Sequence, residues 1–206
     1  MAVRTGTEAL VAYRDRSQNE IRNIRVVRFD GESWCEPTLL HDDGWKIAGC
    51  PVNGPALAAE GDRVAAAWYT APGGTPRVKV AFSDDGGRQF SEPVVVAKGT
   101  PKGRVDIVLL DDDTAAVSWL GQSEDGASLR VQAVQPEDSG GRSATIATLG
   151  AASRGVGMPR LVRHGSFLYA AWTNPEGEAY RPRGSASMGS ASRHHHRRIR
   201  HHPRRS

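Results

Sequence analysis

Apolar and polar residues alternate along most of the chain, in short runs separated by Gly, Asp, Asn and Pro. Alternation with a period of two predicts β-strands. In "FSDDGGRQFSEPVVV", two Asp and two Gly separate a run ending at Phe82 from one opening at Phe90. This spacing predicts a hairpin, because Gly tolerates positive φ and Asp can hydrogen-bond the turn's own backbone. We therefore expect an all-β fold.

The alternating runs form a repeat. Similar segments end in Tyr13, Trp68, Trp119 and Trp172, which are 55, 51 and 53 positions apart. A short apolar strand precedes each Trp segment and alternating strands follow, so each unit predicts four short antiparallel strands. Such a meander cannot bury both faces alone, and neighbouring units must stack. We expect the aromatic to pack between units; carbohydrate stacking by the three Trp is the weaker alternative.

Radial stacking of these units predicts a β-propeller. WD-type repeats are shorter, at about 40 to 45 residues, and their Gly-His and Trp-Asp signatures do not appear. Three to four blades fit within residues 1–178, and the first unit lacks an inner strand while the last lacks two outer ones. The chain is thus expected to be a partial propeller, a fragment whose uncovered blade faces and edges promote self-association.

One turn carries a family motif. The stretch from Ser83 to Phe90 resembles the Asp box, Ser-x-Asp-x-Gly-x-x-aromatic, of sialidase-like (bacterial neuraminidase repeat) propellers. In this turn Asp85 can accept backbone N–H groups, Gly86 can take positive φ, Ser83 can add a hydrogen bond and Phe90 can anchor the next strand. The stretch "RFDGESW" resembles a shortened copy. The expected role of this Asp box is structural.

The resemblance covers about residues 8–174, and the part from residue 21 to the Asp box is similar to bacterial proteins labelled exo-α-sialidase. It implies a six-bladed parent with a glycan or sialoside-like ligand. It also implies a secreted or periplasmic parent. The N-terminus shows no secretory signal pattern, so the chain is either cytoplasmic or lacks its beginning, and the sequence leaves its compartment unknown.

In such a meander, the Asp-box turn lies at one end and the longer loops lie at the other, where we expect function. These loops are residues 14–20, 41–55, 71–76, 98–106, 121–128 and 150–160. Arg22, Arg104 and Arg154 come from three neighbouring units, and sialidases grip the substrate carboxylate with an Arg triad. The resemblance therefore suggests these three as substrate-binding residues. The competing interpretation is that each is a solvated or blade-bridging Arg.

Sialidases also use a Tyr nucleophile and an acidic acid/base residue. The candidates for the acid are Asp15, Glu20 and Asp106. No convincing nucleophile is found, since Tyr13 occupies the repeated core position and Tyr69 neighbours Trp68. Asn53 is a further candidate for ligand binding, with the shaping of a turn as its alternative role.

The basic charge is confined to one end. Eight of the 27 Lys and Arg lie from Arg181 onward with no acid, which leaves 19 basic and 23 acidic residues before it, a net charge of −4. Residues 179–206 are therefore expected to form a disordered Arg/His/Ser-rich tail. Its possible origins are a nucleic-acid or membrane-surface arm, metal capture by the histidines at 194–196, and a frameshift or gene-model artefact, which we favour. No nucleic-acid partner is expected.

The remaining chemistry is sparse. No apolar run reaches the roughly 18 residues that a membrane span needs. Cys35 and Cys50 are expected to be free, with a disulfide as the alternative. No zinc spacing, phosphate loop or dinucleotide fingerprint is present, so neither a metal site nor a cofactor is expected.

These patterns leave two functions open. The first is an exo-α-sialidase-like glycoside hydrolase or glycan-binding propeller, of which this chain is an incomplete and inactive portion. The second is a non-catalytic Asp-box propeller that acts as a protein-binding or assembly scaffold. A fold alone does not decide between them.

Overall fold

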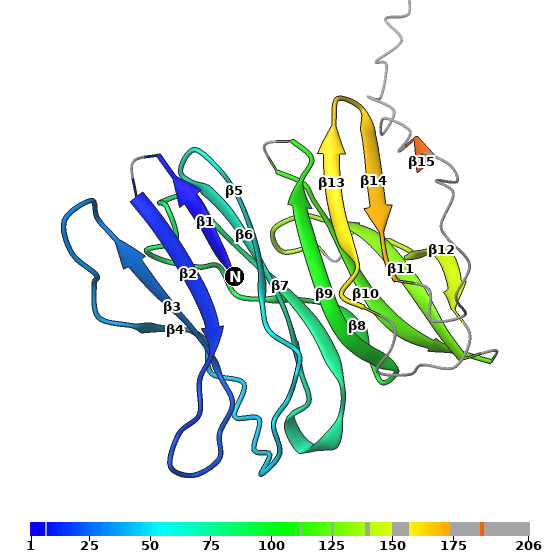
Figure 1. The fold of residues 1–206 in the computed structure, drawn as a ribbon, viewed down its shortest axis with the longest axis horizontal. Helices are drawn as coiled ribbons and strands as arrows, with labels where there is room; N and C mark the ends of the chain where they lie inside the picture. Colours follow the sequence, from blue (N-terminus) through cyan, green and yellow to red (C-terminus); the bar gives the residue numbers. More distant parts are fainter. Residues whose placement is uncertain are drawn as a thin grey trace, which may run out of the picture.

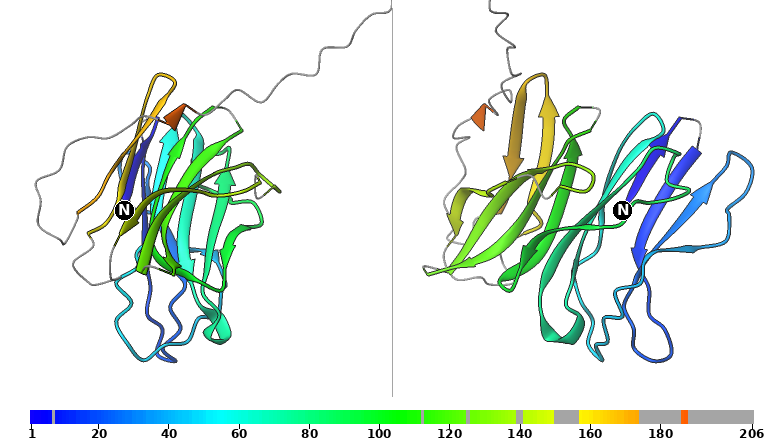
Figure 2. Two further views of the ribbon diagram at one scale, coloured as in Figure 1. Left: turned by 90° about the vertical axis from the view of Figure 1, so that its right-hand side faces the viewer. Right: turned by 180° about the vertical axis from the view of Figure 1, so that it is seen from behind.

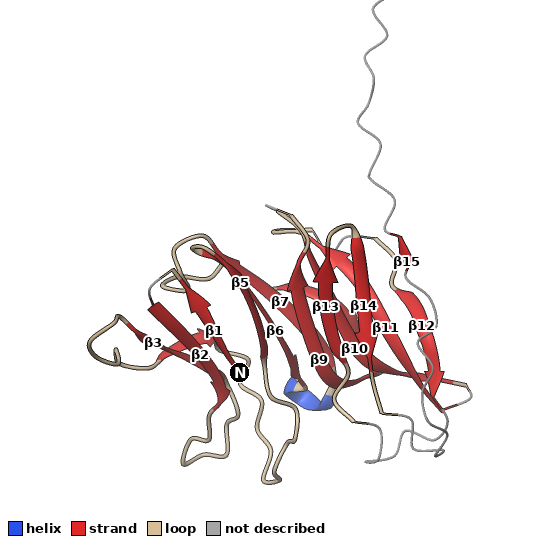
Figure 3. Cartoon of the chain, turned by 45° about the horizontal axis from the view of Figure 1, so that its top comes forward, coloured by secondary structure: helices blue, strands red, loops and turns tan. Residues whose placement is uncertain are grey.

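The structure, a computed structural model, describes residues 1–6, 8–111, 113–124, 126–138, 141–149 and 157–173, and the backbone of 186–187. These residues form four antiparallel sheets and one short 3-10 turn, η1 (Pro72–Gly74), drawn in blue in Figure 3. The expected all-β class is confirmed. No helix in this part of the chain is long and apolar enough to cross a membrane.

The strands of each sheet follow one another in sequence. Sheet 1 has the order β1-β2-β3-β4 and comprises β1 (Ala2–Thr5), β2 (Glu8–Arg14), β3 (Ile24–Phe29) and β4 (Thr38–His41). Sheet 2 has the order β5-β6-β7-β8 and comprises β5 (Ala56–Glu60), β6 (Arg63–Thr70), β7 (Arg77–Ser83) and β8 (Val94–Lys98).

Sheets 3 and 4 continue the pattern. Sheet 3 has the strands β9 (Pro101–Leu109), β10 (Ala115–Ser123), β11 (Gly126–Val134) and β12 (Ala144–Leu149). Sheet 4 has the strands β13 (Arg160–His164), β14 (Phe167–Ala171) and β15 (Ala186–Ser187). Two of the expectations for the terminal units are therefore wrong, because β1 supplies an inner strand to the first unit and β15 supplies a third strand to the last.

Sheets 1, 2 and 3 stand side by side in chain order, from left to right in Figure 1, and β13 and β14 of sheet 4 lie beside sheet 3 (Figures 1 and 2). The first strands of neighbouring sheets, β1, β5, β9 and β13, pack against one another. This is the arrangement of blades around a propeller axis, and the first strands are the inner ones. The chain is a partial β-propeller.

Burial on both faces explains the apolar sequence of β6. Val64, Ala66 and Trp68 point into a core shared with sheet 1. Ala65 and Ala67 point into a core shared with sheet 3. A strand enclosed on both faces has no polar side, and its small residues suit closely packed neighbours.

The recurrent Trp packs between sheets, as expected. Trp68 is completely buried against sheet 1, and Trp119 is 3% exposed against sheet 2. Trp172 packs on the core of sheet 3 around Leu120 and Leu129. Each Trp therefore faces the sheet that precedes its own in the chain.

Two segments expected as loops are mostly strand. Residues 98–106 contain a two-residue turn followed by β9, and residues 121–128 contain the tight β10–β11 hairpin. The Pro and Gly residues there suggested loops. However, Pro101 is the first residue of β9, a position that tolerates Pro, and Gly103 lies where the β9–β10 register shifts, as at a bulge.

Candidate functional site

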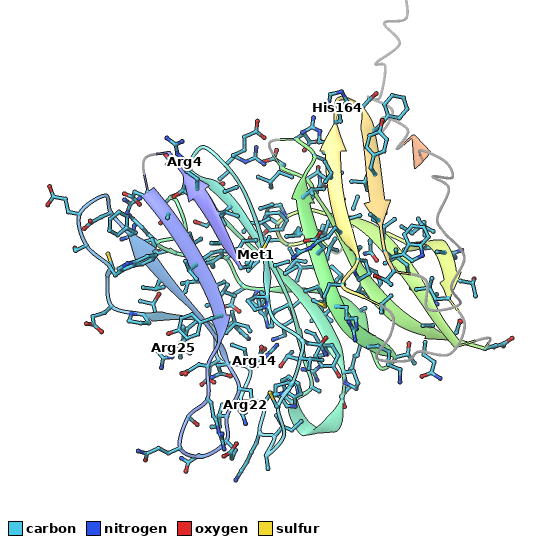
Figure 4. The ribbon with its side chains drawn as sticks, in the orientation of Figure 1. Met1, Arg4, Arg14, Arg22, Arg25 and His164 are labelled. Atoms are coloured by element: carbon cyan, nitrogen blue, oxygen red, sulfur yellow. The ribbon has the colours of Figure 1, made fainter. Side chains whose placement is uncertain are left out.

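The two ends of the sheets carry different chemistry. The turn of residues 83–90, which resembles an Asp box and is called the Asp-box turn below, joins β7 to β8. It lies beside the β5–β6 turn, since Gly86 N–H donates to the Asp62 carbonyl at 2.7 Å. The β2–β3 loop lies at the other end, where Arg14, Arg22 and Arg25 gather, away from Arg4 and His164 (Figure 4). Candidate ligand residues are therefore sought at the end that holds the β2–β3 loop.

Asp85 organises the Asp-box turn. Its Oδ1 accepts the N–H groups of Arg88 at 2.8 Å and Gln89 at 2.9 Å, and the Ser83 hydroxyl at 2.7 Å. Partial burial acts to raise the pKa of Asp85, but the hydrogen bonds from Gln89, Ser83 and Arg88 outweigh it and lower the pKa. The ionised carboxylate of Asp85 therefore stabilises this turn.

The turn also contacts sheet 1. Gly86 and Gly87 have φ of 72° and 82°. A Cβ on Gly87 would lie 2.6 Å from Leu10 Cδ2, so a larger residue here would force the Leu10 side chain to shift. Phe90 packs against the same sheet 1 and sheet 2 core. These contacts give the motif residues a packing role at the end opposite the candidate site.

The β2–β3 loop holds two of the acid candidates in ion pairs. Asp15 accepts from Arg25 Nε at 2.8 Å. Glu20 accepts from Arg16 at 2.5 Å and from Arg22 at 2.8 Å. The hydrogen bond from Arg16 is the main cause of a lowered pKa at Glu20. A lowered pKa opposes proton donation near neutral pH.

Arg22 is committed to its own loop region. It is 8% exposed, and besides Glu20 its guanidinium donates to the carbonyls of Ile47 at 3.2 Å and Gly49 at 2.9 Å. It therefore fixes the β4–β5 crossing against the β2–β3 loop. Binding a substrate carboxylate would require it to release these partners.

Arg14 occupies the centre of this end. It donates to the carbonyls of Asn53 at 2.9 Å, Arg22 at 2.7 Å and Tyr69 at 2.5 Å. Its guanidinium lies 4.9 Å from the ring centre of Trp45. Burial lowers the pKa of Arg14 to about 10. This side chain joins sheets 1 and 2 and was not singled out by the sequence.

Asn53 and Arg104 are brought together between sheets 2 and 3. Asn53 Oδ1 accepts the Arg104 N–H at 3.0 Å, and its Nδ2 donates to the Lys102 carbonyl at 3.3 Å. The Asn53 side chain fills the space beside Gly103, where a Cβ would lie 2.5 Å from it. Asn53 thus fixes the backbone that presents Arg104.

Arg104 differs from the other arginines at this end. Its φ is 55°, an unusual value for a residue with a side chain. Its Nη1 makes a weak contact of 3.7 Å with Met158 Sδ. Within the described ranges, no carboxylate forms an ion pair with Arg104.

Asp106 lies two residues further along β9 and is 4% exposed. Its Oδ2 accepts the Leu161 N–H at 2.7 Å, and Oδ1 lies 3.6 Å from Arg160 Nη1. Burial raises the pKa of Asp106, despite the opposing effects of Leu161 and Arg160. Of the acid candidates, this one has the shift that a general acid needs.

Asp106 and Arg160 line an open groove of about 590 Å³ along the inner strands β5, β9 and β13. They occupy equivalent positions, because Asp106 lies opposite Ser118 and Arg160 lies opposite Ala171, each just before the recurrent Trp. The offset of one repeat is the sequence signal that could have identified Arg160.

The structure groups the candidates in separate places. Glu20 and Arg22 form one pair, Asn53 and Arg104 a second, and Asp106 lies beside Arg160. Arg154 lies outside the described residues, so the Arg triad stays a prediction. Cys35 and Cys50 are both free, and Cys50 is exposed. No group of three or more His, Cys, Asp or Glu suited to a metal ion occurs within the described ranges.

No protein-family model and no curated protein sequence matches the chain. Among solved structures, it is similar to the Hadza microbial sialidase Hz136, with 19% identity and a TM-score of 0.53, over 86% of this chain and 42% of the sialidase. It also aligns with the Bombyx mori GH32 beta-fructofuranosidase BmSUC1, with 13% identity and a TM-score of 0.48, over 84% of this chain and 42% of that enzyme. The chain spans less than half the length of either protein. At these identities the likeness to the sialidase shows the fold alone.

Proposed function

We propose that the chain is part of a sialidase-like propeller that binds an acidic glycan, with Arg104 as the residue that receives the sugar carboxylate. The observation that carries the proposal is the backbone of Arg104. A left-handed φ on a residue with a side chain costs on the order of 1–3 kcal/mol and occurs preferentially at functional sites. Here the Asn53 side chain accepts the Arg104 N–H and packs against Gly103.

The charge of Arg104 supports the same role. The guanidinium groups of Arg14 and Arg22 already donate hydrogen bonds to backbone carbonyls, and Arg22 also donates to Glu20. The guanidinium of Arg104 contacts the thioether of Met158 and forms no ion pair within the described ranges. A guanidinium matches a carboxylate with two parallel hydrogen bonds. Arg104 is therefore the arginine at this end best placed to bind an anionic sugar.

Asp106 is the proposed acid of the parent enzyme. Its raised pKa and its place on the axial groove, two residues from Arg104, support that assignment. With no nucleophile identified, this chain alone is expected to bind the glycan without hydrolysing it. The parent is proposed to be an exported exo-α-sialidase-like hydrolase.

The test is titration of the chain with a sialylated oligosaccharide and with the same oligosaccharide lacking sialic acid. We expect binding of the first only, weakened at least about tenfold by Arg104→Ala, the loss of a charged hydrogen-bond partner. Arg4→Ala, at the opposite end, is the matched control. Equal binding of both sugars, or an unchanged Arg104→Ala, would refute the carboxylate-binding role.

A chromogenic sialoside assay on the same samples addresses catalysis. Turnover by this chain that Asp106→Asn abolishes would show that it is active by itself, against our expectation of binding alone.

A non-catalytic scaffold is the second candidate. The observation that favours it is the exposure of large apolar side chains on sheet 4, including Phe167 and Tyr169. A folded chain that binds neither oligosaccharide would favour this function over glycan binding.

A further inference from the structure

One position in each sheet faces the sheet that follows. The residue at this position belongs to the second strand of the sheet and comes three residues before the recurrent aromatic. It lies opposite a residue of the inner strand. The pairs are Val3 with Leu10, Ala58 with Ala65, Val108 with Ala116, and Val162 with Tyr169. Leu10, Ala65 and Ala116 are completely buried, because the next sheet covers them.

The fourth pair is uncovered. Val162 is 59% exposed and Tyr169 is 50% exposed. Phe167, also exposed, lies on the same face of β14, with its ring centre 6.4 Å from that of Tyr169. We call Val162, Phe167 and Tyr169 the sheet 4 face. Contiguous exposed apolar side chains of this kind mark interaction surfaces.

A second position in each sheet faces the sheet that precedes. This second site holds two residues of the second strand, the recurrent aromatic and the residue two positions before it. The pairs are Val11 and Tyr13, Ala66 and Trp68, Val117 and Trp119, and Ala170 and Trp172. In sheets 2, 3 and 4 these residues pack on the preceding sheet. In sheet 1, Val11 and Tyr13 are only half-buried, because no other sheet of the described residues covers them, and Val27 lies opposite Val11. We call Val11, Tyr13 and Val27 the sheet 1 face.

The two uncovered faces are of opposite kind. Each of the three interfaces within the chain joins a face of the sheet 4 kind to a face of the sheet 1 kind. The uncovered pair therefore has the chemistry of a fourth such interface. In the described residues, β1 of sheet 1 packs on β5 of sheet 2 and β13 of sheet 4 packs on β9 of sheet 3, so sheets 2 and 3 separate the two faces.

Two arginines near these faces are already paired with carboxylates. Arg25, opposite Tyr13, donates to Asp15 at 2.8 Å. Arg160, next to the sheet 4 face, lies 3.6 Å from Asp106. Association would therefore not bury either guanidinium without a carboxylate, which would be costly.

We propose that the sheet 4 face of one chain docks on the sheet 1 face of a second copy, so that copies associate head to tail. The contact is heterologous, because two different surfaces meet, and it closes into a ring or continues as a filament. The proposal does not require glycan binding, although Val162 also lines the groove that holds Asp106.

The test is sedimentation velocity over a concentration series, with Val162→Asp and Val11→Asp, each of which places a charge in one face. We expect wild type to associate and each variant to be monomeric, with the dissociation constant raised at least about 100-fold. Mixing the two variants should restore a one-to-one complex, since one keeps an intact sheet 1 face and the other an intact sheet 4 face. Val95→Asp, at an exposed apolar residue of β8, is the control.

Several outcomes would overturn the proposal. Val11→Asp that still associates would indicate a contact between two sheet 4 faces. A mixture that stays monomeric, with both variants melting like wild type, would also contradict it. A wild-type monomer would leave the sheet 4 face to another occupant, such as a further segment of a longer chain.

Discussion

The indole Nε1 of Trp68 donates a hydrogen bond to Oδ2 of Asp43 at 2.6 Å. The recurrent aromatic of sheet 2 therefore also holds the crossing from β4 to β5. Lys79, opposite Trp68 in the β6–β7 register, donates to the other oxygen of Asp43 at 2.6 Å. The carboxylate is fully buried, and His41 Nε2 lies 3.7 Å from it.

Replacing Lys79 tests this buried pair. Lys79→Met should lower the free energy of unfolding by about 3 kcal/mol, because Asp43 would keep its burial and lose its cation. Urea unfolding measures the change, with Lys98→Met at an exposed position as the control. Equal stability of the two variants would show that the pair does not hold the crossing.

Removing Asp85 should destabilise the Asp-box turn. Asp85→Ala should cost about 2 kcal/mol at neutral pH, since charged hydrogen bonds to Arg88 N–H and Gln89 N–H are lost. The folded pKa of Asp85 is lowered, so its contribution is present above the unfolded pKa and lost as the pH falls through the folded pKa. Unfolding measured from pH 7 to pH 3 should show the variant and wild type converging. The neighbouring Asp84→Ala is the control, and a gap that persists in acid would contradict this assignment.

The pKa of Asp106 is shifted in the opposite direction to that of Asp85. Its folded pKa is raised by burial, so folding favours the protonated form, and this stability fades as the pH rises from the unfolded pKa through the folded one. Asp106→Asn keeps an acceptor for Leu161 N–H and cannot ionise. Thermal melting between pH 4 and pH 8 should show the melting temperature of the variant rising relative to that of wild type as the pH rises. A constant difference across that range would exclude the raised pKa.

Gly87 tests the contact between the turn and sheet 1. Gly87→Ala should destabilise by about 2 kcal/mol or more, since a Cβ would meet Leu10 and the backbone is left-handed. Gly74→Ala shares a positive φ of 77° but has no atom within 4 Å of the added Cβ, so it should cost about 1 kcal/mol. Chemical denaturation of both compares them, and equal losses would mean that Leu10 moves aside freely.

We expect Arg104 to lower the stability of the chain while it contributes to ligand binding. Arg104→Gly should stabilise the chain by about 1 kcal/mol, because Gly adopts positive φ without strain, and should weaken binding of the sialylated oligosaccharide as Arg104→Ala does. Glu137→Gly, at a φ of 64°, should relieve strain without affecting the ligand. Melting and titration of both variants check this, and a destabilised Arg104→Gly would show that the side chain itself supports the fold.

The hydrophobic pattern and the aromatic repeat were sufficient to predict the fold class, the four-stranded unit and the packing of each Trp. These features depend on which residues can be buried, and burial follows local periodicity. Within a unit the pattern was less reliable, since Pro101 and Gly103 suggested a loop where β9 runs. A strand start and a bulge use the same residues as a loop.

The candidate site was harder to predict. The sequence placed Arg22 and Arg104 at one end of the sheets, but only the structure separates Arg22, held by Glu20 and loop carbonyls, from Arg104, which has no ion pair within the described ranges. The raised pKa of Asp106 likewise arises from its burial at the contact between β9 and β13.

The sequence by itself determined the repeated blade, because alternation and the recurrent aromatic are properties of each unit alone. The tertiary structure decided which charges are paired, which backbone is left-handed and which faces lie uncovered, because these depend on contacts such as Asn53 with Arg104 and Asp43 with Lys79, between residues far apart along the chain.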